Sequence, residues 1–435
     1  MSARNRELLA LVPASLLLTA GFAAIFIQQS GVQSDVSLTY GAVFLGLCFA
    51  GHLAIRFTLP HADPYLFPLV AVLACFGLVV IYRLDEDLAR EQAQWFVVGL
   101  VLFAATMVFL RDFRVLERYR YTVAAAGLLL LLLPRVPGIG QQVNGAYLGV
   151  ELGPVSFQPA EFGKIAIVIF LAAYLRDTRQ VLILGARRFL GVTIPPLKHF
   201  GPLLVVWGGA MLMLVFIRDL GSSLMFFGGF LALLYVATNR LSFAVIGMGM
   251  FAVGAWFFAS TVGHVEDRIA TWRDPFDPQL YDKPGGSYQI AQSLFAQADG
   301  GLFGTGFGQA TLNLPTGQSI LPAPHTDLIY AVITNELGLA GACGLLLVYL
   351  LFVERGFATA VRAQDSFSKL LATGLTAVFA LQVFVIVGGV TKVIPLTGVT
   401  LPFVSYGGSS ILANFILLAL LLLVSDRARR PERTR

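Results

Sequence analysis

Apolar residues recur in long blocks along this chain of 435 residues, and short polar stretches separate the blocks. A helix needs about 20 predominantly apolar residues to cross a bilayer, and each block is close to that length. The pattern therefore predicts twelve membrane-spanning helices and no soluble domain. They are expected at about residues 8–28, 37–57, 65–83, 92–110, 121–134, 159–175, 200–217, 220–238, 241–262, 328–353, 369–390 and 400–425.

Composition agrees with this class, because 57% of the residues are hydrophobic and only 13% are charged. The three cysteines, Cys48, Cys75 and Cys343, all fall inside predicted spans, so we expect neither a disulfide framework nor thiol chemistry. The first apolar block has an arginine-bearing flank like a signal peptide. Eleven further spans follow it, and we expect it to be retained.

The basic residues predict the orientation in the membrane. Most of the 30 Lys and Arg residues fall in the two termini and in alternate loops, as at 111–120, 176–198 and 427–435. By the positive-inside rule, both termini are cytoplasmic and the loop at 264–327 faces outward. The net charge of +5 then indicates attraction to anionic lipid. It gives no reason to expect nucleic-acid binding.

The first long outward loop, at 135–158, ends where a helix is expected to start. Pro159 suits the first turn, and Glu161 suits the positive end of the helix dipole. Lys164 lies three residues later on the same face. The two charges predict either a mutually neutralising pair or a lysine that serves as counter-ion for a diphosphate.

The second outward loop, at 264–330, is long, polar and rich in glycine. Residues 288–296 mix aromatic, apolar and polar side chains, which predicts a short helix lying in the membrane interface. Glycines follow at 300, 301, 304, 306 and 308, where backbone N–H groups could approach a bulky or anionic ligand. A flexible connector explains these glycines equally well.

Asp327 stands at the edge of a new hydrophobic helix. A carboxylate placed where water meets hydrocarbon costs solvation energy, so we expect a charged, polar or reactive neighbour. Glu336 is predicted on the opposite face, as a structural residue or part of a deeper polar cluster. The pair Arg218 and Asp219 indicates local ion pairing or helix capping as readily as catalysis. Glycines and hydroxyls at 402–410 predict a kink or close packing in the last span.

Several of these segments occur together in one known family. The chain resembles the SEDS proteins (shape, elongation, division and sporulation), which include RodA, FtsW and SpoVE, and is most similar to RodA and FtsW of actinobacterial type. The resemblance covers about residues 65–425. The segments that carry it are 157–161, 219–221, 274–293, 300–306, 325–327, 336–341 and 402–410.

The resemblance implies an all-α polytopic membrane protein with a ten-helix core at 61–425, which includes an extracellular loop at 263–327. Two extra N-terminal helices would occupy 1–60, and a basic cytoplasmic tail 426–435. It implies an inverting peptidoglycan glycosyltransferase that polymerises lipid II outside the plasma membrane, for cell elongation and shape or for division. A divalent cation, Mg²⁺ or Mn²⁺, is the implied cofactor. The implied partners are a class B penicillin-binding protein and other elongasome or divisome membrane proteins.

The resemblance also implies site residues. Asp327 matches the essential aspartate, and we interpret it as a general base, a ligand of the cation, or both. The expected substrate-binding residues are Glu161, Lys164, Arg268, Arg273, Gln289, Gln292, Ser293, His325, Thr326, Ser405 and Tyr406.

The chain departs from the family pattern at a few positions. Leu148 and Gly149 replace an Arg-Trp pair, so a role given to that tryptophan cannot be transferred. Ala323 stands where relatives often have Glu, and Ile386 where they often have Asn. Asn335 replaces the first Glu of a Glu-Glu-Leu motif.

Two other classes of function stay open. Charges within membrane helices commonly mark transport pathways, which would suit a lipid II flippase. Against this, the paired interrupted helices of inverted repeats are absent from the sequence pattern. A non-catalytic scaffold of a cell-wall synthase would keep the apolar helices without requiring Asp327.

Overall fold

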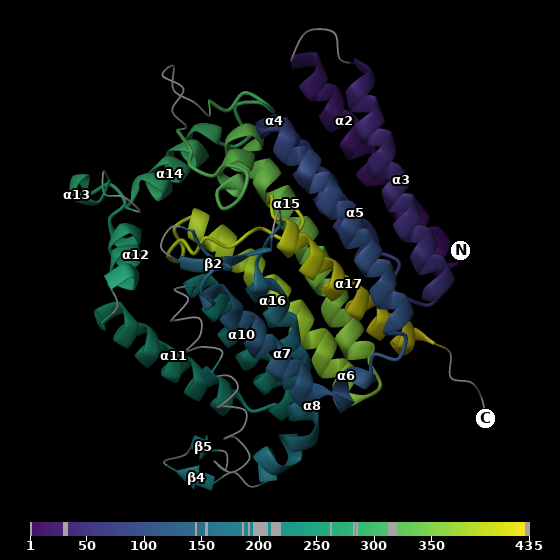
Figure 1. Cartoon of the computed structure of the whole chain (residues 1–435), viewed down its shortest axis with the longest axis vertical. Helices are drawn as coiled ribbons and strands as arrows, with labels where there is room; N and C mark the ends of the chain where they lie inside the picture. The colour runs from purple at the N-terminus through teal and green to yellow at the C-terminus, as the bar shows by residue number, and fades with distance from the viewer. Residues whose placement is uncertain are drawn as a thin grey trace. The chain divides into compact units, whose positions relative to one another are not determined.

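The computed structural model describes residues 2–28, 34–143, 146–152, 155–184, 187–189, 192–194, 208–209, 219–261, 263–281, 283, 286–311 and 320–430. Most of these residues are helical, which confirms the predicted all-α class (Figure 1). The chain divides into two compact units. Unit 1 comprises Met1–Val108, Asp267–Arg355 and Gln382–Arg435, and unit 2 comprises Phe109–Glu266 and Gly356–Leu381.

Unit 1 contains the N-terminal helices, the helices of the long polar loop and the last helix. Helices α15 and α16 run through both units, and α12 begins in unit 2. The elements are α1 (Ala3–Ala10), α2 (Val12–Gln28), α3 (Ser34–Thr58), α4 (Leu66–Leu84), α5 (Glu86–Phe109), α12 (Gly263–Arg273), α13 (Pro278–Tyr281), α14 (Tyr288–Gly300), α15 (Ile329–Arg362), α16 (Ser366–Val390) and α17 (Gly408–Arg429).

Unit 2 combines helices with two small antiparallel sheets. Its elements are α6 (Val115–Arg118), α7 (Arg120–Leu132), the 3-10 helix η1 (Leu133–Arg135), β1 (Gly140–Val143), β2 (Ala146–Leu152), β3 (Val155–Phe157), α8 (Pro159–Leu184), β4 (Arg187–Phe189), β5 (Val192–Ile194), α10 (Leu220–Thr238) and α11 (Leu241–Thr261). The order β1-β2-β3 shows that the first polar loop is a small sheet, which the pattern of hydrophobic residues did not predict.

Among the described residues, eight helices are long and apolar enough to cross a membrane. They match eight of the twelve predicted spans: Ala3–Ala24, Gly41–Thr58, Leu66–Leu84, Glu86–Phe109, Gly221–Thr238, Ile329–Arg362, Ser366–Val390 and Gly408–Arg429. Three more predicted spans coincide with α7, α8 and α11. The span predicted at 200–217 lies almost entirely outside the described residues, as does Arg218.

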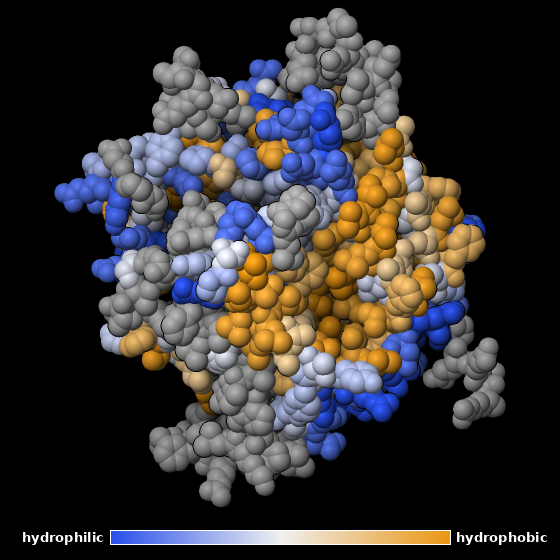
Figure 2. Space-filling model, viewed as in Figure 1, coloured by the Kyte–Doolittle hydropathy of each residue, from blue (hydrophilic) through white to orange (hydrophobic). Residues whose placement is uncertain are grey.

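Apolar side chains are exposed on several of these helices. On α5, Val97, Val98, Val101 and Val108 are each at least 41% exposed. Figure 2 shows apolar side chains gathered where this helix crosses the view. An apolar face of this kind on a helix of spanning length suits contact with lipid, and the chain is a multi-pass membrane protein.

The core of unit 1 is built around α17, which is buried along most of its length. The ring of Phe415 lies 5.1 Å from that of Phe96 and 5.4 Å from that of Phe403. Close approach needs small residues on the neighbouring helices. A Cβ on Gly77 of α4 would lie 2.6 Å from the Val404 backbone, so α4 packs directly on the segment that precedes α17.

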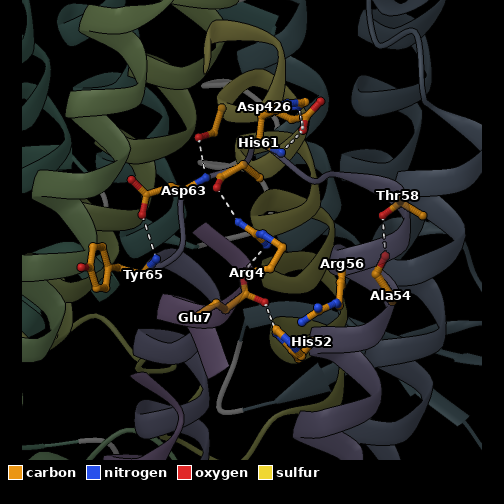
Figure 3. A network of polar contacts seen from close by, with 12 residues as sticks. Arg4, Glu7, His52, Ala54, Arg56, Thr58, His61, Asp63, Tyr65 and Asp426 are labelled. Carbon is orange, nitrogen blue, oxygen red and sulfur yellow. Dashed lines mark hydrogen bonds and ion pairs between the residues drawn. The ribbon is translucent and has the colours of Figure 1, made fainter. Parts of the chain in front are cut away.

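Buried polar side chains tie the N-terminal helices to the end of α17 (Figure 3). Arg4 pairs with Glu7 and donates to the backbone oxygen of Ala62. The next residue, Asp63, pairs with Arg429 near the end of α17. The first 60 residues belong to unit 1, and the hydrogen bond from Arg4 to the Ala62 oxygen crosses the boundary that the sequence suggested at residue 60.

A kink occurs in α15, whereas the sequence left a kink or close packing open for the last span. Gly338, inside α15, has φ 66°, in the left-handed region that favours glycine. In the last span, by contrast, residues 402–407 precede the helix, and α17 is regular from Gly408 onward. The glycines there permit close packing, since a Cβ on Gly408 would lie 2.6 Å from the Trp95 ring. Of the two alternatives predicted for residues 402–410, close packing is confirmed and a kink is not found, because residues 402–407 form a loop ahead of the helix.

Candidate active site around Asp327

Asp327 lies at the end of a tight turn, just before the start of α15. Ala323 adopts φ 48°, and its backbone oxygen accepts hydrogen bonds from the N–H groups of Thr326 at 3.2 Å and Leu328 at 3.4 Å. This turn places Asp327 two residues before the first residue of α15, with its side chain partly exposed. The position agrees with the prediction of a carboxylate at the edge of a hydrophobic helix.

Ser405 and Tyr406, in the segment before α17, form hydrogen bonds to this turn. The N–H of Tyr406 donates to the backbone oxygen of His325 at 2.8 Å. The Ser405 hydroxyl donates to the backbone oxygen of Thr326 at 2.7 Å and accepts from the N–H of Leu401 at 2.9 Å. Both residues directly before the aspartate are therefore fixed through their backbone, which limits where its carboxylate can lie.

Residues 401–407 are themselves anchored to α5 and α15. The Gln92 amide donates to the Ser405 oxygen and accepts from the Gly407 N–H, both at 3.1 Å. The buried Tyr349 hydroxyl donates to the Pro402 oxygen at 2.6 Å. Neither Gln92 nor Tyr349 was expected at the site, because their contacts join segments more than 50 residues apart in sequence.

The surroundings of Asp327 change its acidity. Burial raises the pKa of the Asp327 carboxyl to about 6, although the charge of Arg268 and a hydrogen bond with Thr326 act to lower it. Gly398 leaves room beside it, since a Cβ there would lie 3.4 Å from Oδ2. The Arg268 guanidinium is held by the backbone oxygen of Leu396 at 2.8 Å. A carboxylate with this pKa is ionised near neutral pH and is a stronger base than an ordinary aspartate.

His325 and Tyr406 pack edge to face, with ring centroids 5.9 Å apart. The Tyr406 hydroxyl donates to the Glu91 carboxylate. Burial is the main cause that raises the pKa of Tyr406, and this hydrogen bond raises it further. Burial lowers the pKa of His325, while the charge of Asp85 acts in the opposite direction. His325 is therefore predominantly neutral at pH 7, so its ring is a weak source of positive charge for a substrate phosphate.

Helix α14 confirms the helix predicted at 288–296 and extends it to Gly300, while its place in the membrane interface stays a prediction. Ser293 is fully buried, and its hydroxyl donates to the backbone oxygen of Val390 at 3.1 Å. The Gln292 amide donates to the Tyr281 hydroxyl at 2.7 Å, whereas Gln289 is partly exposed. Arg273, at the end of α12, is exposed.

Two of the expected substrate-binding hydroxyls have other roles in this structure. Ser293 and Ser405 are 0% and 2% exposed, and each hydroxyl is bonded to backbone. Neither side chain is accessible to a ligand in this structure. Ser293 joins α14 to the end of α16, and Ser405 holds the turn before Asp327, while the remaining substrate contacts stay predictions.

Glu161 and Lys164 form the expected pair in unit 2. Helix α8 begins at Pro159, as predicted, and the Lys164 ammonium lies 2.5 Å from the Glu161 carboxylate. Both side chains are buried. The mutual neutralisation predicted from their spacing is confirmed, and a role toward a diphosphate stays a prediction.

The described residues hold no cluster of three or more His, Cys, Asp or Glu side chains that could bind a metal ion by themselves. Mg²⁺ is commonly held by one or two carboxylates together with substrate phosphates. Asp327 fits that arrangement only jointly with a phosphate-bearing substrate. The structure thus offers one candidate ligand and no complete metal site within the described part of the chain.

Comparison with known proteins identifies the family. A family model described as a cell cycle protein, for FtsW, RodA and SpoVE, matches residues 64–430. The chain belongs to this family. The resemblance to SEDS proteins is therefore confirmed, and the match begins after α3, so the first three helices precede it.

Individual members of the FtsW, RodA and SpoVE family show how far the similarity extends. Peptidoglycan glycosyltransferase RodA of Mycobacterium tuberculosis is 44% identical over 99% of this chain and 92% of the relative. Stage V sporulation protein E of Bacillus subtilis is 30% identical over 83% of this chain and 93% of the relative.

Solved structures of the family agree with the fold. The rod shape determining protein RodA of Thermus thermophilus aligns with a TM-score of 0.60 and 26% identity, over 85% of this chain and 98% of that chain. A chain from a peptidoglycan synthase complex for polymerization and crosslinking aligns with a TM-score of 0.66 and 27% identity, over 85% of this chain and 99% of that chain.

Proposed function

We propose that this chain is a peptidoglycan glycosyltransferase that polymerises lipid II into glycan strands at the outer face of the plasma membrane. The observation that carries the proposal is the partly exposed Asp327 carboxylate, whose pKa is about 6, at the start of a membrane-spanning helix. Family members carry this activity in their names, including relatives 44% and 31% identical to this chain. The basic residues support the orientation, with both termini cytoplasmic and the 263–327 loop outside.

Asp327 acts as the general base in this proposal. It accepts the proton of the acceptor sugar's 4-hydroxyl as that oxygen attacks the anomeric carbon of the donor. A new glycosidic bond forms while the bond from the anomeric carbon to the diphosphate breaks, with inversion. General-base assistance typically contributes ~10²–10⁴ in rate.

The departing lipid diphosphate needs positive charge. Arg268 suits this role, because its charge acts on Asp327 and the backbone oxygen of Leu396 holds its guanidinium in place. Lys164 remains a second candidate, and Arg273, Gln289 and Gln292 remain candidates for the sugar or peptide. A divalent cation shared by Asp327 and the diphosphate would neutralise further charge.

We propose a RodA-type role in elongation and cell shape. The similarity to mycobacterial RodA extends over 99% of this chain and therefore includes the N-terminal helices. The similarity to three FtsW and SpoVE relatives extends over only 83–85% of this chain. A class B penicillin-binding protein is the proposed transpeptidase partner. The similarity to a chain from a polymerization and crosslinking complex supports this pairing.

The test is synthesis of glycan strands from purified lipid II by the purified chain in detergent. Detergent leaves no second compartment, so product there supports a polymerase and counts against a flippase alone. Product without a partner protein counts against a scaffold. The Asp327→Asn variant, prepared in parallel, shows whether a contaminating enzyme contributes. If the wild type yields no polymer with or without its transpeptidase and added Mg²⁺ or Mn²⁺, the proposed function is wrong.

A further inference from the structure

The glycine-rich loop after α14 replaces two hydrogen bonds of α15. In a straight helix, the N–H groups of Leu339 and Ala340 would donate to the oxygens of Asn335 and Glu336. At the Gly338 kink they donate instead to loop oxygens, those of Gly301 and Leu302, at 3.0 Å. The two freed oxygens accept from loop N–H groups, those of Thr305 at 2.9 Å and Gly306 at 3.1 Å. The loop thus completes the backbone bonding of an interrupted helix, which a spanning segment requires.

This fit leaves no room for side chains. A Cβ on Gly304 would lie 2.1 Å from the Glu336 backbone oxygen, and one on Gly338 would lie 2.3 Å from the Gly304 nitrogen. A Cβ on Gly300 would likewise meet the Thr334 oxygen at 2.1 Å. The glycines predicted either to approach a ligand or to form a flexible connector therefore approach α15 itself.

A buried ion pair fixes the loop in the kink. Arg83, at the end of α4, lies 2.9 Å from the Glu336 carboxylate, and the two side chains are 10% and 2% exposed. The Arg83 guanidinium also donates to the backbone oxygens of Gly308 and Ala310, both at 3.0 Å. The Glu336 carboxylate accepts from the Gly308 N–H at 2.9 Å. One pair of charges thus joins α4, the loop and α15.

The part of α15 before the kink is therefore held at both ends. Ser405 and Tyr406 hold the turn that carries Asp327, and Arg83 with Glu336 holds the kink nine residues later. The same loop lines a cavity of about 300 Å³, to which Thr305, Gln309 and Ala310 contribute together with Asn335 and residues of α14. Release of the loop would remove a cavity wall and free the helix segment that starts beside the proposed base.

We propose that Arg83 is a positioning residue for glycan polymerisation, which keeps the 300–310 loop in the kink of α15 and thereby fixes the helix segment that begins at Asp327. This inference rests on the proposed function. Arg83 acts through the loop and Glu336 and does not contact the reacting atoms. Misplacement of a catalytic group by about 1 Å can cost about 100-fold in rate, so loss of this constraint should lower kcat more than it raises KM.

Two properties of the purified full-length chain test the proposal: amide hydrogen exchange of segments 300–310 and 339–340, and kcat and KM for lipid II. In Arg83→Ala, we expect exchange in these segments to be at least about tenfold faster. We expect kcat to fall about 100-fold, with KM changed less than about threefold. Arg83→Lys keeps the charge but not the planar guanidinium, whose Nη2 atom makes the three contacts described above, so its kcat should lie between those of the wild type and Arg83→Ala.

Arg90→Ala is the matched control, because Arg90 is 54% exposed and pairs with acidic side chains on its own helix. It should match the wild type in both measurements. All comparisons use the monodisperse folded fraction, and Arg83→Lys keeps the test available if Arg83→Ala does not fold.

The proposal is overturned if either Arg83 variant leaves loop exchange unchanged, or if exchange rises while kcat per folded molecule stays at the wild-type value. A wild type that makes no glycan would contradict the proposed function instead. The hydrogen exchange data would then still decide whether Arg83 holds the loop.

Discussion

Two carboxylates near the start of α15 differ in exposure and in their partners. Glu336 is 2% exposed, pairs with Arg83 and accepts a backbone hydrogen bond. Asp327 is partly exposed. Burial raises its pKa to about 6, because the charge of Arg268 and the hydrogen bond with Thr326 only partly counter the effect of burial. The comparison teaches that charge in a membrane helix does not by itself mark a reactive group. The partly exposed carboxylate is the one that a substrate can reach.

The sharpest way to break this comparison is to neutralise Asp327. Asp327→Asn should reduce the rate of lipid II polymerisation by ~10²–10⁴, because the base is lost while size and shape are kept. Gel analysis of glycan strands made by the purified variant measures the effect. Asp87→Asn, which changes an acid with an 87% exposed side chain on α5, is the control and should retain wild-type activity. An Asp327→Asn enzyme that works at the parental rate would remove Asp327 from the chemistry.

Neutralising Glu336 should affect stability first. Glu336→Gln leaves Arg83 buried without its counter-charge, and breaking a buried pair typically costs ~3–5 kcal/mol. Denaturation in detergent micelles measures this loss. An unchanged unfolding midpoint would show that the pair contributes nothing to the fold.

Asp327→Asn should not destabilise the protein at pH 7.5. The folded-state pKa of Asp327 lies above its ordinary value of 3.8. The stability it contributes is therefore present below about pH 3.8 and lost as pH rises through about 6. Asp327→Asn should therefore lose activity and keep its stability, whereas Glu336→Gln should lose stability first.

A smaller loss of activity is expected when the hydrogen bonds that hold the backbone before Asp327 are removed. Ser405→Ala leaves the Thr326 oxygen and the Leu401 N–H without a partner, and kcat should fall about tenfold. Initial rates at saturating lipid II measure it. Ser156→Ala, on an exposed hydroxyl of β3, should have no effect. Equal rates for the two variants would mean that the Ser405 contacts do not position the base.

Tyr406→Phe should have the smallest effect. It removes the hydrogen bond to Glu91, while the backbone N–H that holds His325 remains. A decrease of about threefold or less is expected in the same assay. A loss as large as that of Asp327→Asn would show that the Tyr406 hydroxyl takes part in the reaction.

Local patterns in the sequence predicted local features well. The start of α8 at Pro159, the pair Glu161–Lys164, helix α14 and the position of Asp327 all follow from spacing, hydrophobicity or helix-end chemistry. The SEDS motifs added the family and the identity of the proposed base.

Features made by contacts distant in sequence were missed. Glu336 pairs with Arg83, which lies more than 250 residues earlier in the sequence. The backbone hydrogen bonds between the loop and α15 at Gly338 leave no periodic pattern in the sequence. One signal was available: Arg83 lies at the predicted outer end of a span, where the positive-inside rule disfavours arginine. The hydroxyls of Ser293 and Ser405 looked like ligand contacts, because sequence does not show which backbone groups need a partner.

The most direct test of the account is the pH dependence of lipid II polymerisation by the wild-type chain, with Asp327→Asn measured beside it. A base with a pKa of about 6 acts only when deprotonated, so the rate should fall about tenfold per unit below pH 6 and level off above about pH 7. The residual rate of Asp327→Asn should lack that inflection. A wild-type rate that stays constant from pH 5 to pH 8, or an inflection that persists in Asp327→Asn, would contradict Asp327 as the base.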